Sequence, residues 1–138
     1  MPVSQRVAFA ILLLFAACSD RTRRETQALV DAVDAYRHAD SASKAARGKA
    51  VGEVACSDPQ VCAARQICVA AIEPTTQALA LKDEVTARIG DIEKGALAPD
   101  SGVAQALPGK LDDAERLLRQ GRDKMGECDV KLAALSTR

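Results

Sequence analysis

The 138-residue chain has very few aromatic residues. It contains no Trp, one Tyr (Tyr36) and two Phe, and both Phe lie within the first 15 residues. Sheet proteins draw on β-branched and aromatic side chains, so this scarcity argues against a β-rich fold. Alanine is by far the commonest residue, leucine and arginine are also abundant, and these three residues favour helices. We therefore expect an all-α protein with a core of small and aliphatic side chains.

The chain also lacks an excess of either charge and the usual signatures of catalysis. Its 19 basic and 19 acidic residues balance, whereas a nucleic-acid-binding protein normally has a basic face, so we expect no nucleic-acid partner. There is no GxSxG motif and no glycine-rich phosphate loop. The one histidine, His38, lies among charged and small residues, and we interpret it as a solvated helix residue. We predict no catalytic, cofactor or metal site and no enzyme activity.

No apolar run in the chain is long enough to span a membrane. The longest, Val7–Ala17, has eleven residues, and a helix of that length covers roughly 16 Å of a ~30 Å hydrocarbon core. A preceding charge at Arg6 and small residues at the end are typical of a secretory signal. The alternative is a buried N-terminal core helix.

The stretch Leu14-Phe15-Ala16-Ala17-Cys18 resembles the lipobox of bacterial lipoproteins. The resemblance implies that the signal is cut before Cys18, that the Cys18 thiol receives a diacylglyceryl group and that the new N-terminus is acylated as well. Phe15 stands where the family commonly has leucine. The alternative is cleavage after Ser19 by the general signal peptidase, which would discard Cys18. The resemblance covers about the first twenty residues only.

Residues that follow Cys18 bear on localisation. The enteric sorting rule reserves inner-membrane retention for aspartate after the cysteine, so Ser19 favours the outer membrane, facing the periplasm. The basic residues Arg21, Arg23 and Arg24 would be attracted to an anionic membrane surface, or would form an extended, solvated linker. We expect a signal peptide over 1–17, a lipidated N-terminus and linker over 18–27, and one helical domain over 28–138.

Apolar spacing and breaker residues divide the mature part into about three long helices. The first is expected from Asp20 to about Arg47, with a break at the glycines Gly48 and Gly52. The second is expected from Pro59, after the capping pair Ser57-Asp58, to about Gly95, with a kink or a split at Pro74. A loop over Gly95–Gly109 and a last helix from Lys110 complete the pattern.

The three helices have apolar faces that predict a small antiparallel bundle. In the first helix the face is Leu29, Val33, Tyr36 and Asp40, and in the second it is Val61, Cys68, Ile72, Thr75, Leu79 and Ile89. In the last helix two rows recur every seven residues, namely Leu111, Leu118, Met125 and Leu132, and Ala114, Gly121, Cys128 and Leu135. This three-four spacing is typical of core packing, and the alternative is a homomeric coiled coil.

Four cysteines remain after Cys18, an even number that suits disulfides in an oxidising compartment. Sequence alone allows three pairings. Antiparallel helices would bring Cys68 and Cys128 to a similar height, and Cys56 and Cys62 would then form a local clip at a helix start, so we favour this pairing. The gaps of six, six and sixty residues do not suit a zinc site or a redox-active dithiol.

Together these features predict a periplasm-facing envelope lipoprotein with two disulfides. We expect it to act as a non-catalytic binding or scaffolding module, with the membrane and an envelope protein as partners and no cofactor. The alternative is a soluble secreted helical inhibitor or accessory subunit of an envelope enzyme.

Overall fold

Four helices make up the described part of the chain. The computed structural model describes the backbone of residues 4–137 and the side chains of residues 20–137. The helices are α1 (Ser4–Arg37), α2 (Ser41–Glu53), α3 (Pro59–Glu93) and α4 (Gly102–Ser136), and residues 4–137 contain no strand. The predicted all-α class is confirmed. Three of the helices are long, as expected, but α2 is a separate fourth helix.

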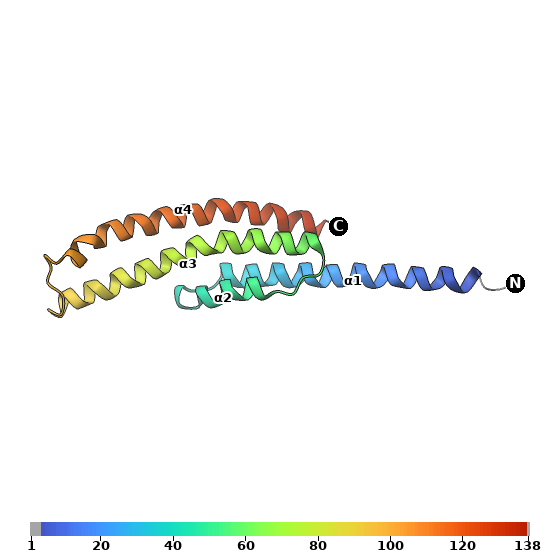
Figure 1. The fold of residues 1–138 in the computed structure, drawn as a ribbon, viewed down its shortest axis with the longest axis horizontal. Helices are drawn as coiled ribbons and strands as arrows, with labels where there is room; N and C mark the ends of the chain where they lie inside the picture. Colours follow the sequence, from blue (N-terminus) through green and yellow to red (C-terminus); the bar gives the residue numbers. More distant parts are fainter. Residues whose placement is uncertain (1–3, 138) are drawn as a thin grey trace.

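Each helix runs antiparallel to the one before it, so α1 and α3 run in the same direction (Figure 1). The helices α3 and α4 form a long hairpin and make the most extensive contact in the molecule. The C-terminal part of α1 and the short helix α2 lie along one half of this hairpin, and the other half extends beyond them to the α3–α4 loop (Figure 1).

The core therefore sits where all four helices meet. Tyr36 is its only aromatic side chain and is 3% exposed. The other members are small or aliphatic, as the composition predicts, and burying them supplies the main driving force for folding. The core cluster consists of Leu29, Val33, Tyr36, Val51, Val61, Ala64, Cys68, Ala71, Ile72, Cys128 and Leu132.

The start of α3 confirms the predicted cap. The Asp58 side chain accepts hydrogen bonds from the backbone N–H groups of Gln60 and Val61, and Pro59 occupies the first helical position. Pro74 lies buried inside α3 and does not divide it. The predicted split into two helices does not occur, and α3 is one continuous, gently curved helix (Figure 1).

The predicted end of the first helix is wrong. The helix α1 ends at Arg37, and both Gly48 and Gly52 lie inside α2. The break falls at residues 38–40 because Asp40 caps α2, accepting a hydrogen bond from the Ser43 N–H at 2.8 Å. A Cβ on Gly48 would lie 2.7 Å from Cγ2 of Ile72, so this glycine serves close helix packing.

The predicted loop over Gly95–Gly109 is also too long. Gly95 ends α3 by adopting a φ of 72°, a conformation that glycine accepts without steric cost. Ser101 then caps α4 by accepting from the Ala104 N–H, so the helix starts at Gly102 and not near Lys110. Pro108 lies exposed inside the helix.

Two predicted core residues need correction, and the segment before residue 28 takes part in the packing. The segment expected as a linker is helical from Asp20 onward, and Glu25 and Thr26 are already buried, so packing begins before residue 28. Ile89 and Leu111, placed on apolar faces by their spacing, are 44% and 41% exposed. Both lie in the half of the hairpin that α1 and α2 do not reach.

Candidate functional site

The predicted lipidation residue, Cys18, lies outside the residues whose side chains the structure describes. The four other predicted site residues are all described, and they form two disulfides, Cys56–Cys62 and Cys68–Cys128. This is the pairing that the helix positions favour.

The Cys68–Cys128 disulfide joins α3 to α4 in the centre of the core. Its Cα atoms are 4.8 Å apart, and both cysteines are fully buried. The bridge closes a separation of 60 residues and restrains the hairpin at the level where α1 packs against it.

The Cys56–Cys62 disulfide has a different position and role. Its Cα atoms are 5.4 Å apart, and both cysteines are partly exposed. Cys56 precedes α3 and Cys62 lies in its first turns, so the bridge fixes the segment that leads into the helix.

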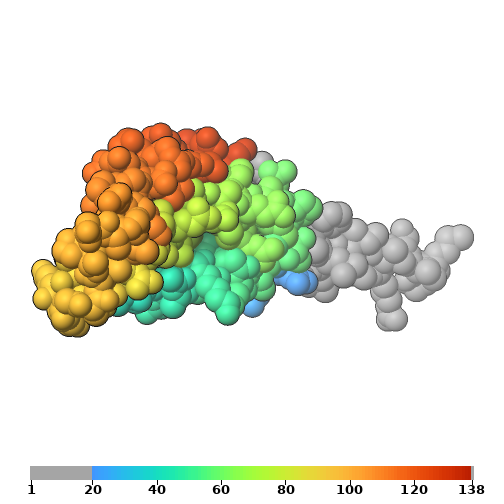
Figure 2. Space-filling view, turned by 60° about the vertical axis from the view of Figure 1, so that its left-hand side comes forward, coloured from blue at the N-terminus to red at the C-terminus, as the bar shows by residue number. Residues whose placement is uncertain are grey.

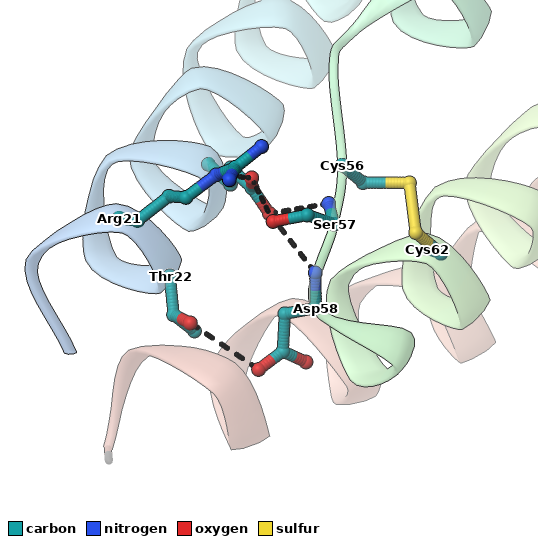
Figure 3. Close-up of polar contacts among 7 residues, drawn as sticks. Arg21, Thr22, Cys56, Ser57, Asp58 and Cys62 are labelled. Carbon is teal, nitrogen blue, oxygen red and sulfur yellow. Dashed lines mark hydrogen bonds and ion pairs between the residues drawn. A yellow bond between two sulfur atoms is a disulfide. The ribbon is translucent and has the colours of Figure 1, made fainter. Parts of the chain in front are cut away.

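A junction of polar groups lies next to this clip and involves Glu25 of α1. Its carboxylate accepts hydrogen bonds from the Ser57 N–H at 2.8 Å, the Ser57 hydroxyl at 2.6 Å and the Asp58 N–H at 3.2 Å. Arg21, one turn earlier in α1, donates to the same carboxylate at 3.1 Å. Figure 3 shows these groups converging between the start of α3 and the helix α1.

These hydrogen bonds lower the pKa of Glu25 from 4.5 to about 2. The largest contributions come from the side chain and backbone of Ser57, because hydrogen bonds to a carboxylate favour its charged form. A negative charge beside the N-terminus of α3 also interacts favourably with the helix dipole. Glu25 is therefore ionised at every pH near neutrality.

A second bond reinforces the same junction. The Thr22 hydroxyl donates to Oδ2 of Asp58 at 3.3 Å, while Oδ1 of Asp58 caps α3 (Figure 3). We call Arg21, Thr22, Glu25, Ser57 and Asp58 the polar junction. It fastens the part of α1 that follows Ser19 to the start of α3, and the Cys56–Cys62 clip holds the α3 side of it in place.

Sequence reasoning identified the Asp58 cap but missed Glu25. The spacing of Arg21 and Glu25 is that of an ordinary surface ion pair on a helix. The available signal was the capping pair Ser57-Asp58, whose free N–H groups need an acceptor, but the sequence does not say which helix supplies it.

Tyr36 occupies a second contact point, where α1, α2 and α3 meet. Its ring lies 3.6 Å from the position that a Cβ on Gly48 would occupy, and Lys44 Nζ lies 4.9 Å from the ring centroid. The hydroxyl is buried, and the side chain of Thr75 lies near it without forming a well-aligned hydrogen bond. Burial raises the pKa of Tyr36. The arrangement is that of a packing residue.

Other groups that could carry chemistry are dispersed. His38 is exposed just after α1, and its Nδ1 lies 2.8 Å from the backbone carbonyl oxygen of Asp34. Within the described residues no three His, Cys, Asp or Glu side chains gather in a way that could hold a metal ion. None of the described helices has an apolar stretch long enough to cross a membrane.

Comparisons with known proteins found no matching family model, no matching curated protein and no matching solved structure.

Proposed function

We propose that this chain is a lipid-anchored protein of the bacterial envelope that faces the periplasm and acts as a non-catalytic binding or scaffolding module. Ser19, the residue after the cysteine, favours the outer membrane. The observation that carries the proposal is the segment Leu14–Cys18, which resembles a lipobox and directly precedes a folded helical domain.

The polar junction supports this proposal because of its position in the chain. Thr22 lies only four residues after Cys18, a rise of about 6 Å in a helix. One end of the bundle contains the start of α3 and the first packed turns of α1. An acyl group on Cys18 would therefore hold this end close to the lipid surface. Two or three acyl chains give a stable anchor.

Basic side chains at the same end of the bundle would strengthen its attachment to a membrane. Arg23 and Arg24 are exposed and form no ion pair with the residues that the structure describes. Each could contribute about 1 kcal/mol to binding at an anionic membrane surface. With its helices along the membrane normal, the 35-residue α3 would hold the α3–α4 loop roughly 50 Å from that surface.

A soluble secreted inhibitor or accessory subunit is the second candidate. It is favoured by the small residues Ala17 and Ser19, which suit the general signal peptidase, together with Phe15 in the position where lipoproteins commonly have leucine. In this case the mature chain would start at Asp20.

The intact mass of the full-length gene product, recovered from membrane and soluble fractions, separates the two candidates. The proposal expects a membrane-bound species with the mass of residues 18–138 plus acyl groups. A C18S variant is the matched control and should lose the acyl mass and leave the membrane. An unmodified mass starting at Asp20 in the soluble fraction would refute the anchor.

A further inference from the structure

The half of the α3–α4 hairpin beyond α1 and α2 has a surface unlike that of the rest of the molecule. We call residues 80–115 the distal hairpin. Contacts of α2 with α3 lie near Ile72 and Thr76, and Figure 1 shows the turn between α1 and α2 ending midway along α3. Figure 2 brings this end forward, and its yellow and orange atoms form the protruding end of the molecule.

Large aliphatic side chains are exposed mainly on the distal hairpin. Four such residues are exposed in the described part of the chain, and three of them, Ile89, Val103 and Leu111, belong to it, with 44%, 48% and 41% exposure. The fourth is Val130. Two helices alone bury only one row of side chains, here Val85, Leu107 and Ala114, so the flanking apolar residues remain open to solvent.

The distal hairpin is also acidic. It contains eight carboxylates and four basic side chains, a net charge of −4. Residues 20–79 and 116–137 contain eleven carboxylates and thirteen basic side chains, a net charge of +2. Four of the eight carboxylates are in ion pairs, Glu84 with Lys110 and Asp91 with Arg88 inside the segment, and Asp113 with Arg116 and Glu115 with Arg119 at its edge. The charged residues of the distal hairpin that form no ion pair with the described residues are the carboxylates Asp83, Glu93, Asp100 and Asp112 and the lysines Lys82 and Lys94, so the segment remains acidic.

We propose that the distal hairpin binds a basic amphipathic segment of another protein. Apolar side chains of that segment would cover Ile89 and Leu111, and its Lys and Arg residues would face the carboxylates that form no ion pair. Helix-on-helix docking of this kind is a recurring mode of recognition, and complementary charge selects the partner. A second copy of this chain is disfavoured at this surface because two distal hairpins would bring like charges together, and an anionic membrane surface is disfavoured for the same reason.

The inference rests on the proposed function in one respect: the anchor at the opposite end would leave this surface free in the periplasm. The surface chemistry itself does not depend on the anchor.

Two synthetic helical peptides test the proposal. One carries leucine on one face and lysine elsewhere, and the other has glutamate in place of every lysine. Binding is measured to the purified full-length product, in phosphatidylcholine nanodiscs if it is acylated and in solution if it is not. We expect the lysine peptide to bind, more weakly as salt rises, and the glutamate peptide to bind at least tenfold more weakly.

Matched variants localise the binding. Neutralising three distal carboxylates (D83N/E93Q/D112N) should weaken the lysine peptide about tenfold, whereas neutralising three exposed carboxylates elsewhere (D20N/D123N/E127Q) should leave affinity within about twofold. I89S/L111S should weaken binding about tenfold and V130S should not. All of these side chains are exposed, so the fold is retained.

Equal effects of the distal and control variants, or equal affinity for both peptides, would overturn the proposal. Absence of the lipid anchor would not overturn it, because peptide binding can be measured on the acylated and on the unacylated protein. A soluble product that still prefers the lysine peptide through the distal hairpin would refute the lipoprotein assignment and support the docking surface.

Discussion

The carboxylate of Glu25 accepts hydrogen bonds from both the backbone N–H and the hydroxyl of Ser57, 32 residues further along the chain. This contact connects the first packed turns of α1 with the segment that enters α3. Because the Glu25 side chain satisfies N–H groups that precede α3, the stability of the junction depends on the charge state of one residue.

We expect acid to weaken this junction. A carboxyl group whose pKa is lowered by folding contributes stability above its unfolded value, and this contribution is lost as the pH falls toward the folded value. For Glu25 those values are 4.5 and about 2, so the loss occurs between about pH 4.5 and pH 2. Urea denaturation at pH 7, 4 and 2.5 would give the free energy of unfolding of wild type and of E25Q. We expect the difference between these two free energies to be largest at pH 7.

The remaining acid sensitivity of E25Q should be smaller but not zero. The pKa values of Asp40 and Glu84 are also lowered, mainly by Ser43 and Lys110 respectively. S57A is the companion variant, and the S57A/E25Q double mutant should lose less stability than the sum of the two single variants. Parallel stability curves for wild type and E25Q across the whole pH range would contradict the role given to Glu25.

The hydroxyl of Tyr36 makes no well-aligned hydrogen bond with the described residues, although the side chain of Thr75 lies near it, whereas the ring fills the core. We therefore expect Y36F to keep the free energy of unfolding within about 1 kcal/mol of wild type or to raise it, because an unpaired buried hydroxyl carries a desolvation cost. Y36A should lose about 3 to 5 kcal/mol through the cavity it leaves. Thermal unfolding of the pair separates the two contributions, and a large loss in Y36F would reveal a hydrogen bond made by the hydroxyl.

Two glycines of α4 should respond in opposite ways to substitution by alanine. A Cβ at Gly121 would lie 2.3 Å from Oγ1 of Thr75 and 3.4 Å from the Ala71 carbonyl oxygen, so G121A should cost about 1 to 3 kcal/mol. At Gly126 a Cβ would meet nothing within 4 Å, and G126A should gain roughly 0.5 to 1 kcal/mol from helix propensity.

A double mutant tests the cause of the G121A effect. Removing the Thr75 hydroxyl and γ-methyl in T75A/G121A should recover part of the loss, since the clash is mainly with that side chain. Similar effects of G121A and G126A in chemical denaturation would show that α3 and α4 are not in close contact at this level.

The features that sequence predicted well are those in which a local pattern has one geometric outcome. Asp58 followed by Pro59 specifies a helix start, and the predicted cap is present. Ala114, Gly121 and Cys128 recur every seven residues along α4, and all three are buried. The disulfide pairing followed from the same periodicity, since it placed Cys68 and Cys128 on facing sides of two helices.

The features that sequence missed depend on tertiary contacts. Gly48 has the low helix propensity that marks a break, but close packing against Ile72 keeps it inside α2. Ser101 caps a helix that runs through Pro108, inside the segment predicted to be a loop. The exposure of Leu111 could not be read from its spacing, which is the same as that of buried Leu132, because only the fold shows how far α1 and α2 extend.

The two disulfides should differ in both stability and accessibility. In the loop-entropy model the Cys68–Cys128 bridge is worth about 4 kcal/mol and the Cys56–Cys62 bridge about 2 kcal/mol. C68A/C128A should therefore destabilise the protein more than C56A/C62A in chemical denaturation. Reduction of the folded protein by a dithiol, followed by alkylation and mass spectrometry, should modify Cys56 and Cys62 first because both are partly exposed. Alkylation of Cys68 and Cys128 at the same rate would mean that the core opens as readily as the clip, and the difference in burial would then not protect the inner bridge.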